Sequence, residues 1–143
     1  MAMLDATGWD LEDSYDPIAL PEGTECKIRI LDVSTGKDKN GLEFLMPRFE
    51  VVDQPLVKDF THFLHIPTDE INPETGKAKM DKKTINRVRR AMLHFFECFQ
   101  IEPGVFDPED DWPGLEGWAL LNYTNDPQYG EQNRVKTFLN KRD

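Results

Sequence analysis

The feature that most constrains the fold is one stretch of helical periodicity set between segments of strand periodicity. Between residues 82 and 99, apolar residues recur at intervals of three and four, which places them on one face of an amphipathic helix. Asp81 is a suitable N-cap, and Pro103 requires the helix to have ended before it. We therefore predict one helix over residues 82–99. Its apolar stripe consists of Ile85, Val88, Met92, Phe95, Phe96 and Phe99.

Five other segments have the composition and alternation of β-strands. The alternation is clearest over 25–33, where Cys26, Ile28 and Ile30 share one face. Pro47 lacks a backbone N–H, so we expect the second strand to be an edge there or to carry a bulge. The five predicted strands cover residues 25–33, 42–52, 59–66, 117–123 and 133–139.

The order of three strands, one helix and two strands predicts a mainly β domain. Short connections between successive strands favour antiparallel pairing. The same element order occurs in the OB-fold, a partly open five-stranded barrel that binds oligonucleotides. A five-stranded sheet with one packed helix and no barrel closure fits the order equally. We expect an acidic N-terminal arm over 1–20 and an OB-fold domain over 21–143.

Length and composition describe one domain without a membrane segment. A chain of 143 residues can bury a core of its own. No apolar run approaches the roughly 20 residues that cross a bilayer, and the N-terminal residues do not have the pattern of a secretory signal. Cys26 and Cys98 lie among apolar neighbours, which is typical of buried thiols in a reducing compartment. We expect a cytoplasmic protein with no membrane partner.

Positive charge is segregated along the chain. All 17 Lys and Arg residues lie within 27–90 or 134–143, although the net charge is −10. Residues 27–90 carry 13 basic and 10 acidic side chains, whereas 1–26 and 91–133 carry seven and nine acids and no base. A polyanion partner would therefore have to bind on one face only.

The candidate binding residues are basic and aromatic side chains that an OB-fold would bring together. Basic side chains neutralise phosphates and aromatic rings stack on bases of any sequence. Phe44 and Trp118 could instead belong to the core or be covered by the arm, and Lys37 and Lys39 could simply solubilise a turn. The candidate DNA-binding residues are Lys27, Arg29, Lys37, Lys39, Phe44, Arg48, Trp118, Tyr123, Tyr129, Arg134 and Lys136.

A second basic cluster lies on the predicted helix. A solvated face, a phosphate-binding track and a partner site are the readings open for it. The acidic segments could shield the basic face, recruit basic partners or only confer solubility. The helix cluster consists of Lys82, Lys83, Arg87, Arg89 and Arg90.

Signals for catalysis or metal binding are weak. His62 and His65 are three residues apart in a predicted strand and would point to opposite faces, which argues against shared zinc ligation with His94 and Cys98. The acids of 107–111 lack the spacing of a calcium loop, and no phosphate loop or nucleophile motif occurs. We therefore expect no enzyme, no metal and no cofactor.

Five short segments of the chain have a familiar combination of residues. They are 20–23, 39–41, 48–51, 115–118 and 129–138. Together they resemble a group of bacteriophage single-stranded DNA-binding proteins, many of them known only as a domain of unknown function. The resemblance covers about residues 17–140, and its most specific part is Tyr129 to Lys136. It implies an OB-fold that binds single strands without sequence preference, with Tyr129, Arg134 and Lys136 as the best candidates.

Together these observations predict a non-catalytic protein that binds and protects single-stranded DNA during phage replication or recombination in an infected bacterium. Phage replication or recombination proteins would be further partners, and a homo-oligomer is left open. The alternative is a non-catalytic protein-interaction subunit of a phage replication or recombination complex. In that case the helix and the acidic arm would be its contact surfaces.

Overall fold

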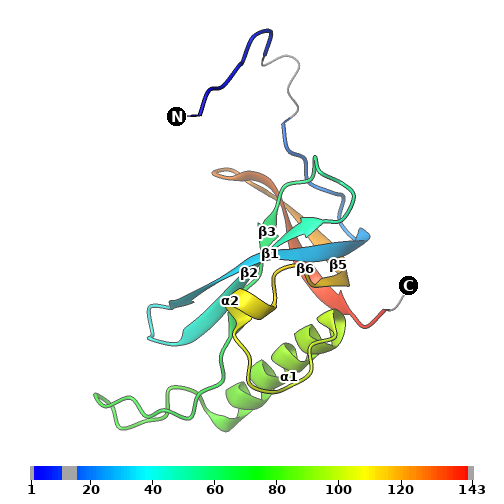
Figure 1. The fold of residues 1–143 in the computed structure, drawn as a ribbon. Helices are drawn as coiled ribbons and strands as arrows, with labels where there is room; N and C mark the ends of the chain where they lie inside the picture. Colours follow the sequence, from blue (N-terminus) through cyan, green and yellow to red (C-terminus); the bar gives the residue numbers. More distant parts are fainter. Residues whose placement is uncertain (1, 11–15, 142–143) are drawn as a thin grey trace.

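The computed structural model describes residues 2–10 and 16–141 (Figure 1). The elements within these ranges are mainly strands, with one long helix in the middle of the chain. They are β1 (Glu25–Lys37), β2 (Glu43–Val51), β3 (Phe60–Thr61), β4 (Leu64–His65), α1 (Lys82–Phe99), α2 (Pro108–Asp111), β5 (Glu116–Asp126) and β6 (Gly130–Leu139).

The strands form one antiparallel sheet in the order β3-β2-β1-β5-β6, with β4 also pairing with β2. This confirms a mainly β fold with one main helix. Among the described residues no ladder joins β3 to β6, so the sheet is not closed into a barrel. Its two ends are linked by side chains: Lys58 Nζ donates to the Glu131 carbonyl at 2.9 Å, and Arg134 Nη1 lies 3.5 Å from the Thr61 carbonyl.

The helix occupies the predicted residues. Asp81 caps it by accepting a hydrogen bond from the Thr84 N–H at 2.7 Å. The helix ends at Gln100, which adopts a left-handed conformation with φ of 57°. The short helix α2 was not predicted; it begins after Asp107, whose carboxylate accepts the Glu109 N–H within the acidic loop.

The prediction of one continuous third strand over 59–66 is wrong, because the structure has two short strands in this range, β3 and β4. The cause lies in β2. The Pro47 carbonyl accepts the His62 N–H at 3.1 Å, so the side of Pro47 that lacks an N–H faces the interruption. Pro47 is not on an edge, since it also pairs with Val33, and the bulge lies in β1 at Leu31.

The other predicted strands are present: β1, β5 and β6 extend beyond their predicted ranges, whereas β2 is one residue shorter at each end than the predicted 42–52. β1 continues to Lys37, and the hairpin of β5 and β6 continues through residues that we expected to form a loop, 124–132. Ladder hydrogen bonds carry these extensions out of the core, where the apolar alternation ends. Figure 1 shows both hairpins projecting beyond the packed part of the sheet.

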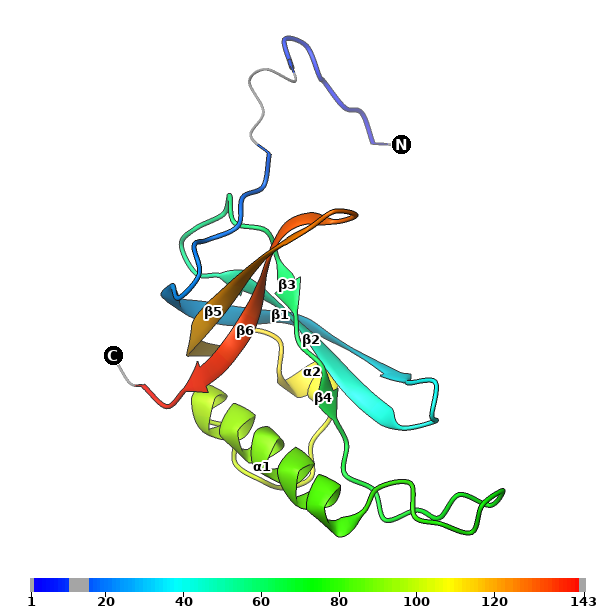
Figure 2. The same ribbon diagram turned by 180° about the vertical axis from the view of Figure 1, so that it is seen from behind.

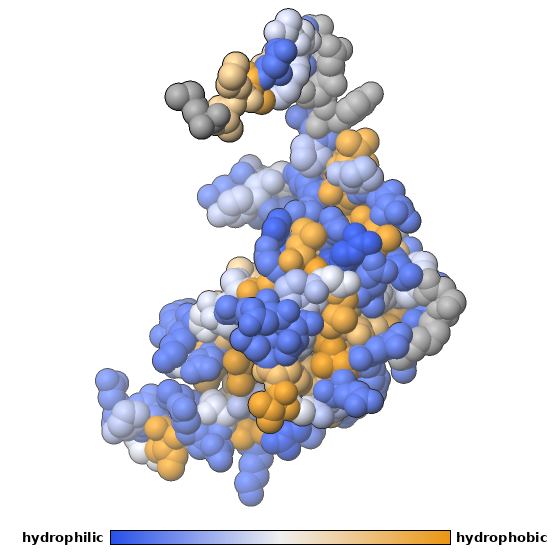
Figure 3. Space-filling view, in the orientation of Figure 1, coloured by the Kyte–Doolittle hydropathy of each residue, from blue (hydrophilic) through white to orange (hydrophobic). Residues whose placement is uncertain are grey.

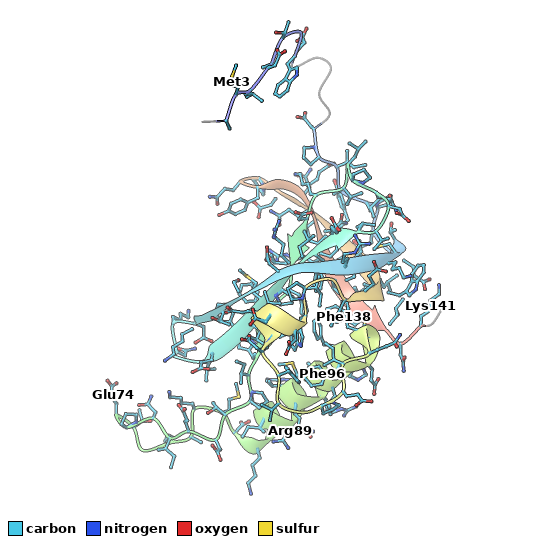
Figure 4. All side chains as sticks on the ribbon, in the orientation of Figure 1. Met3, Glu74, Arg89, Phe96, Phe138 and Lys141 are labelled. Carbon is cyan, nitrogen blue, oxygen red and sulfur yellow. The ribbon has the colours of Figure 1, made fainter. Side chains whose placement is uncertain are left out.

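The core lies between the inner face of the sheet and α1. Phe49 of β2 is fully buried, with its ring centroid 5.8 Å from those of Phe60 and Phe99 and 6.1 Å from that of Phe138. Figure 4 shows Phe138 between the sheet and the helix. Trp112, after α2, is 1% exposed and packs on the other flank of α1. No helix among the described residues is long and apolar enough to span a membrane.

The end of the N-terminal segment is held by the domain. Ile18 pairs with Val57, and its N–H donates to the Leu56 carbonyl at 2.8 Å. Asn133, which is 3% exposed, accepts the Leu20 N–H and donates to the Leu20 and Asn122 carbonyls. Buried amide side chains with all partners satisfied fix local geometry, so Asn133 joins the entry of the chain to the β5–β6 hairpin.

Gly117 provides a test of how closely α1 packs on β5. A Cβ there would lie 2.6 Å from Cys98 Sγ and 2.8 Å from the Cys98 carbonyl oxygen. Because the carbonyl cannot rotate away, we predict that Gly117→Ala lowers the free energy of unfolding by about 2 kcal/mol or more, measured by chemical denaturation. Gly104→Ala is the matched control, since a Cβ there meets nothing within 4 Å. Equal effects of the two substitutions would contradict this packing.

Candidate nucleic-acid interface

Strand register places six of the predicted residues on the outer face of the sheet, away from α1. Directly paired residues of neighbouring strands share a face. Lys27 pairs with Trp118, and Arg29 pairs with both Glu50 and Glu116. Arg48 pairs with Asp32 and Thr61, Phe44 with Gly36 and His65, and Arg134 with Asn122. The predicted residues on this face are Lys27, Arg29, Phe44, Arg48, Trp118 and Arg134.

The cations of this face are already paired with carboxylates. Arg29 lies 2.7 Å from Glu50 and 2.6 Å from Glu116, and these hydrogen bonds, that to Glu116 first, raise its pKa. Lys27 also contacts Glu116, at 3.8 Å. The centre of the outer face is therefore charge-balanced.

Arg48 is held in the same way by two carboxylates. It lies 2.6 Å from Asp32 and 2.7 Å from Asp59. Both pairs are partly exposed, with 43% of the Arg48 side chain accessible to solvent. Ion pairs at such positions are weak and exchangeable, so a phosphate could replace either carboxylate.

A partly exposed aromatic pair lies near the β1–β2 turn. Phe44 and Phe63 meet edge to face with ring centroids 5.0 Å apart, and Phe63 is 50% exposed. Phe44 rests on Gly36, where an added Cβ would come within 2.8 Å of the ring. We did not predict Phe63, although alternation from the buried Phe60 and Leu64 would have placed it on the outer face.

The basic residues of the β1–β2 turn lie beside this pair. Lys37 and Lys39 are exposed, and Lys37 lines a hollow together with Phe44 and Ile66. Asp38 orders the turn by accepting the N–H groups of Asn40 and Leu42. The turn thus presents cations next to rings on which bases could stack.

A second hollow lies at the other end of the outer face, beside the β5–β6 turn. It is lined by Tyr129, Arg134, Lys58 and Thr61, among others. Tyr129 is 64% exposed, and Arg134 is exposed. Lys58 was not predicted, because only its contact with the β5–β6 hairpin brings it to this site. Figure 3 shows the surface indented between the two projecting hairpins.

Three of the predicted residues are engaged within the fold or lie away from the two hollows. The Tyr123 hydroxyl donates to Glu131 at 2.6 Å, which raises the pKa of Tyr123. Lys141 Nζ lies 4.1 Å from the centre of the Trp118 ring and covers it. Lys136 lies on the side of β6 that borders α1, where it shares a hollow with His94.

The site has no arrangement typical of a metal centre. Among the described residues, no three His, Cys, Asp or Glu side chains are grouped to hold an ion. His62 instead packs edge to face on Phe138, with ring centroids 4.9 Å apart. Burial, and then the charge of Arg134, lower the pKa of His62 to about 4.

No protein-family model matches the chain, and no curated protein is similar to it in sequence.

His62 makes a specific contribution to the pH dependence of stability. Its pKa is about 4 in the folded protein and about 6.5 when unfolded, so the unfolded chain takes up the proton first as the pH falls. We predict a loss of about 2–3 kcal/mol of unfolding free energy between pH 6.5 and pH 4, with no His62 contribution to the slope above pH 7.

The measurement is denaturant unfolding across this pH range, compared between variants. His62→Leu should remove this component of the slope, whereas His94→Gln, at an exposed histidine, should retain it. If His62→Leu and the unmodified chain lose stability in parallel, His62 is not the group responsible.

Proposed function

We propose that this chain is an OB-fold protein that binds single-stranded DNA without sequence preference and without catalysis. The observation that carries the proposal is the partly exposed Phe44–Phe63 pair, which lies on the outer face beside the cations of the β1–β2 turn. A π-face accepts any base, and basic side chains follow the phosphates.

The strand order supports the OB-fold part of the proposal. β1 lies at the centre between β2 and β5, β6 follows β5, and side-chain contacts bring β6 towards β3. This is the order of a five-stranded OB barrel with a partly open seam between its third and fifth strands. Such barrels bind along the second and third strands and through the loops at their ends, which here correspond to β2, β3 and the two hairpin turns.

The proposed path of the strand connects the two hollows. Bases would stack at Phe44 and Phe63, and phosphates would pass Arg48 towards Arg134 and Tyr129. Lys37, Lys39 and Lys58 would add charge at the two ends. From the resemblance of the sequence, we further propose that the protein coats strands exposed during phage replication or recombination in the bacterial cytoplasm.

One observation favours the alternative of a protein-interaction subunit. Residues 2–10 expose apolar side chains that no core requires, with Met3 95%, Leu4 78% and Trp9 70% exposed. These side chains lie in the acidic segment that would carry such a contact. A protein contact through this segment is compatible with DNA binding. If the chain does not bind DNA, the protein-interaction function becomes the preferred proposal.

The aromatic pair gives the first test. Stacking contributes about 1–3 kcal/mol per base, so we predict that Phe63→Leu weakens binding of labelled oligo-dT by about 5-fold to 100-fold, measured by fluorescence anisotropy. Trp9→Leu is the matched control, since it removes an exposed ring outside the proposed path. Absence of binding by the unmodified chain at ~50 mM salt would refute the proposed function.

The paired carboxylates give the second test. If phosphate replaces Asp59 at Arg48, then Asp59→Asn removes a competitor and should raise oligo-dT affinity about threefold or more, in line with the small energies of exposed ion pairs. The control is Asp110→Asn in α2, which makes the same change of charge on the acidic loop and should raise the affinity for oligo-dT less. Titration at fixed salt compares the two, and equal gains would mean that Arg48 does not contact the strand.

A further inference from the structure

The open seam of the sheet leads directly onto α1. A hollow lies between β6 and the interruption that separates β3 from β4. It is lined by His62 of the interruption, by Ala91 and His94 of α1, and by residues 135–138 of β6. Figure 2 shows β6 and β4 on either side of this seam, with α1 beneath them. The floor of the seam is therefore the helix.

The solvent face of α1 carries cations that form no ion pair within 4 Å among the described residues, and the charge of Arg87 adds to the Thr84 hydrogen bonds in lowering the pKa of Asp81. All five cations in its first half are exposed, and none forms an ion pair with an acid in the part of the chain that the structure describes. The contrast with Arg29 and Arg48 on the outer face is direct, since both of those have carboxylate partners. The five are Lys82, Lys83, Arg87, Arg89 and Arg90.

Helical geometry divides these cations between two flanks. Lys83 and Arg87 lie in one row with Ala91 and His94, at spacings of four, four and three, and the last two line the seam. Arg90 lies one turn before His94 on the same side. Lys82 and Arg89 lie in the row that leads to Phe96, which packs against Phe106 and Trp112 on the opposite flank. Figure 4 shows Arg89 and Phe96 on α1.

Basic residues recur along a route from the outer face to the seam flank of α1. Arg134 lies at the hollow beside Tyr129, and its charge acts on His62, which lines the seam. Lys136 follows on β6 and faces the same seam as His94. From His94 the next cations along the helix are Arg90 and Arg87. The lining of the seam hollow contains no acid, whereas that of the hollow beside Tyr129 contains Asp59.

We propose that a bound single strand continues from Arg134 across the seam past Lys136 and onto α1, where Lys83, Arg87 and Arg90 bind its phosphates. This inference rests on the proposed function and extends it: the site has a second part, reached only by longer oligonucleotides. The partner is the same strand rather than another protein, because the charge is continuous with the proposed groove. Lys136, which lies off the outer face, acquires a role as the link between the two parts.

The test compares two lengths of oligo-dT. A strand of about 8 nucleotides lies within the range of about 4–16 covered by one OB domain, whereas about 30 nucleotides would reach the helix. We predict that Lys83→Gln with Arg87→Gln weakens binding of the long strand at least about fivefold and leaves the short strand within about twofold. The salt dependence for the long strand should become shallower by about 1.4, at about 0.7 for each lost phosphate contact.

The matched control is Lys82→Gln with Arg89→Gln, which removes one Lys and one Arg from the other flank of the same helix. All four side chains are exposed, and thermal unfolding checks that both variants fold. Equal losses for the two pairs, or equal losses for the two lengths, would overturn the proposed path and leave the proposed function standing. A changed oligomeric state of the Lys83/Arg87 variant, with unchanged affinity for the long strand, would overturn it in favour of a protein contact. Failure of the unmodified chain to bind either length would refute the proposed function itself.

Discussion

The packing of the helix against both ends of the open sheet is the contact on which the rest of the structure depends. No ladder joins β3 to β6 among the described residues, so their relative position is set by what lies beneath them. Phe95 and Phe99 of α1 contact Phe49 of β2 on one side and Phe138 of β6 on the other. Each buried ring contributes a large apolar area, and together the rings hold the seam at a fixed width without ladder hydrogen bonds across it.

This arrangement explains how an acidic chain can present a basic surface. The outer face of the sheet carries cations, but register places carboxylates opposite Arg29 and Arg48. The helix differs because its core-facing stripe is apolar and its solvent face has no acid before Glu97. The basic part of the sequence therefore forms two surfaces: the outer face of the sheet, where Arg29 and Arg48 are paired with carboxylates, and the solvent face of α1, whose cations form no ion pairs with the described residues. The two surfaces meet at the seam, which the aromatic rings hold in place.

Sequence predicted the helix well because three independent signals agreed there: an apolar stripe, an N-cap at Asp81 and a proline-glycine stop. Strand positions were also predicted, but their ends were not, because ladder pairing extends the hairpins beyond the apolar alternation. The break between β3 and β4 required knowing which side of Pro47 faces a neighbour. The ion pairs of Arg29 and Arg48 depend on register and on the bulge at Leu31, which no local pattern specifies.

The segment that most strongly suggested a function also has a structural role. Asn133 lies in the motif that resembles phage DNA-binding proteins, yet its side chain is buried and holds Leu20 to β5. Its neighbour Arg134 is exposed and reaches the carbonyl of Thr61 across the seam. In a strand, successive side chains point to opposite faces, so one short motif can fix the fold with one residue and present a cation with the next. The basic and aromatic residues of this segment that remain exposed are Tyr129, Arg134 and Lys136, and these are the ones available to the proposed binding.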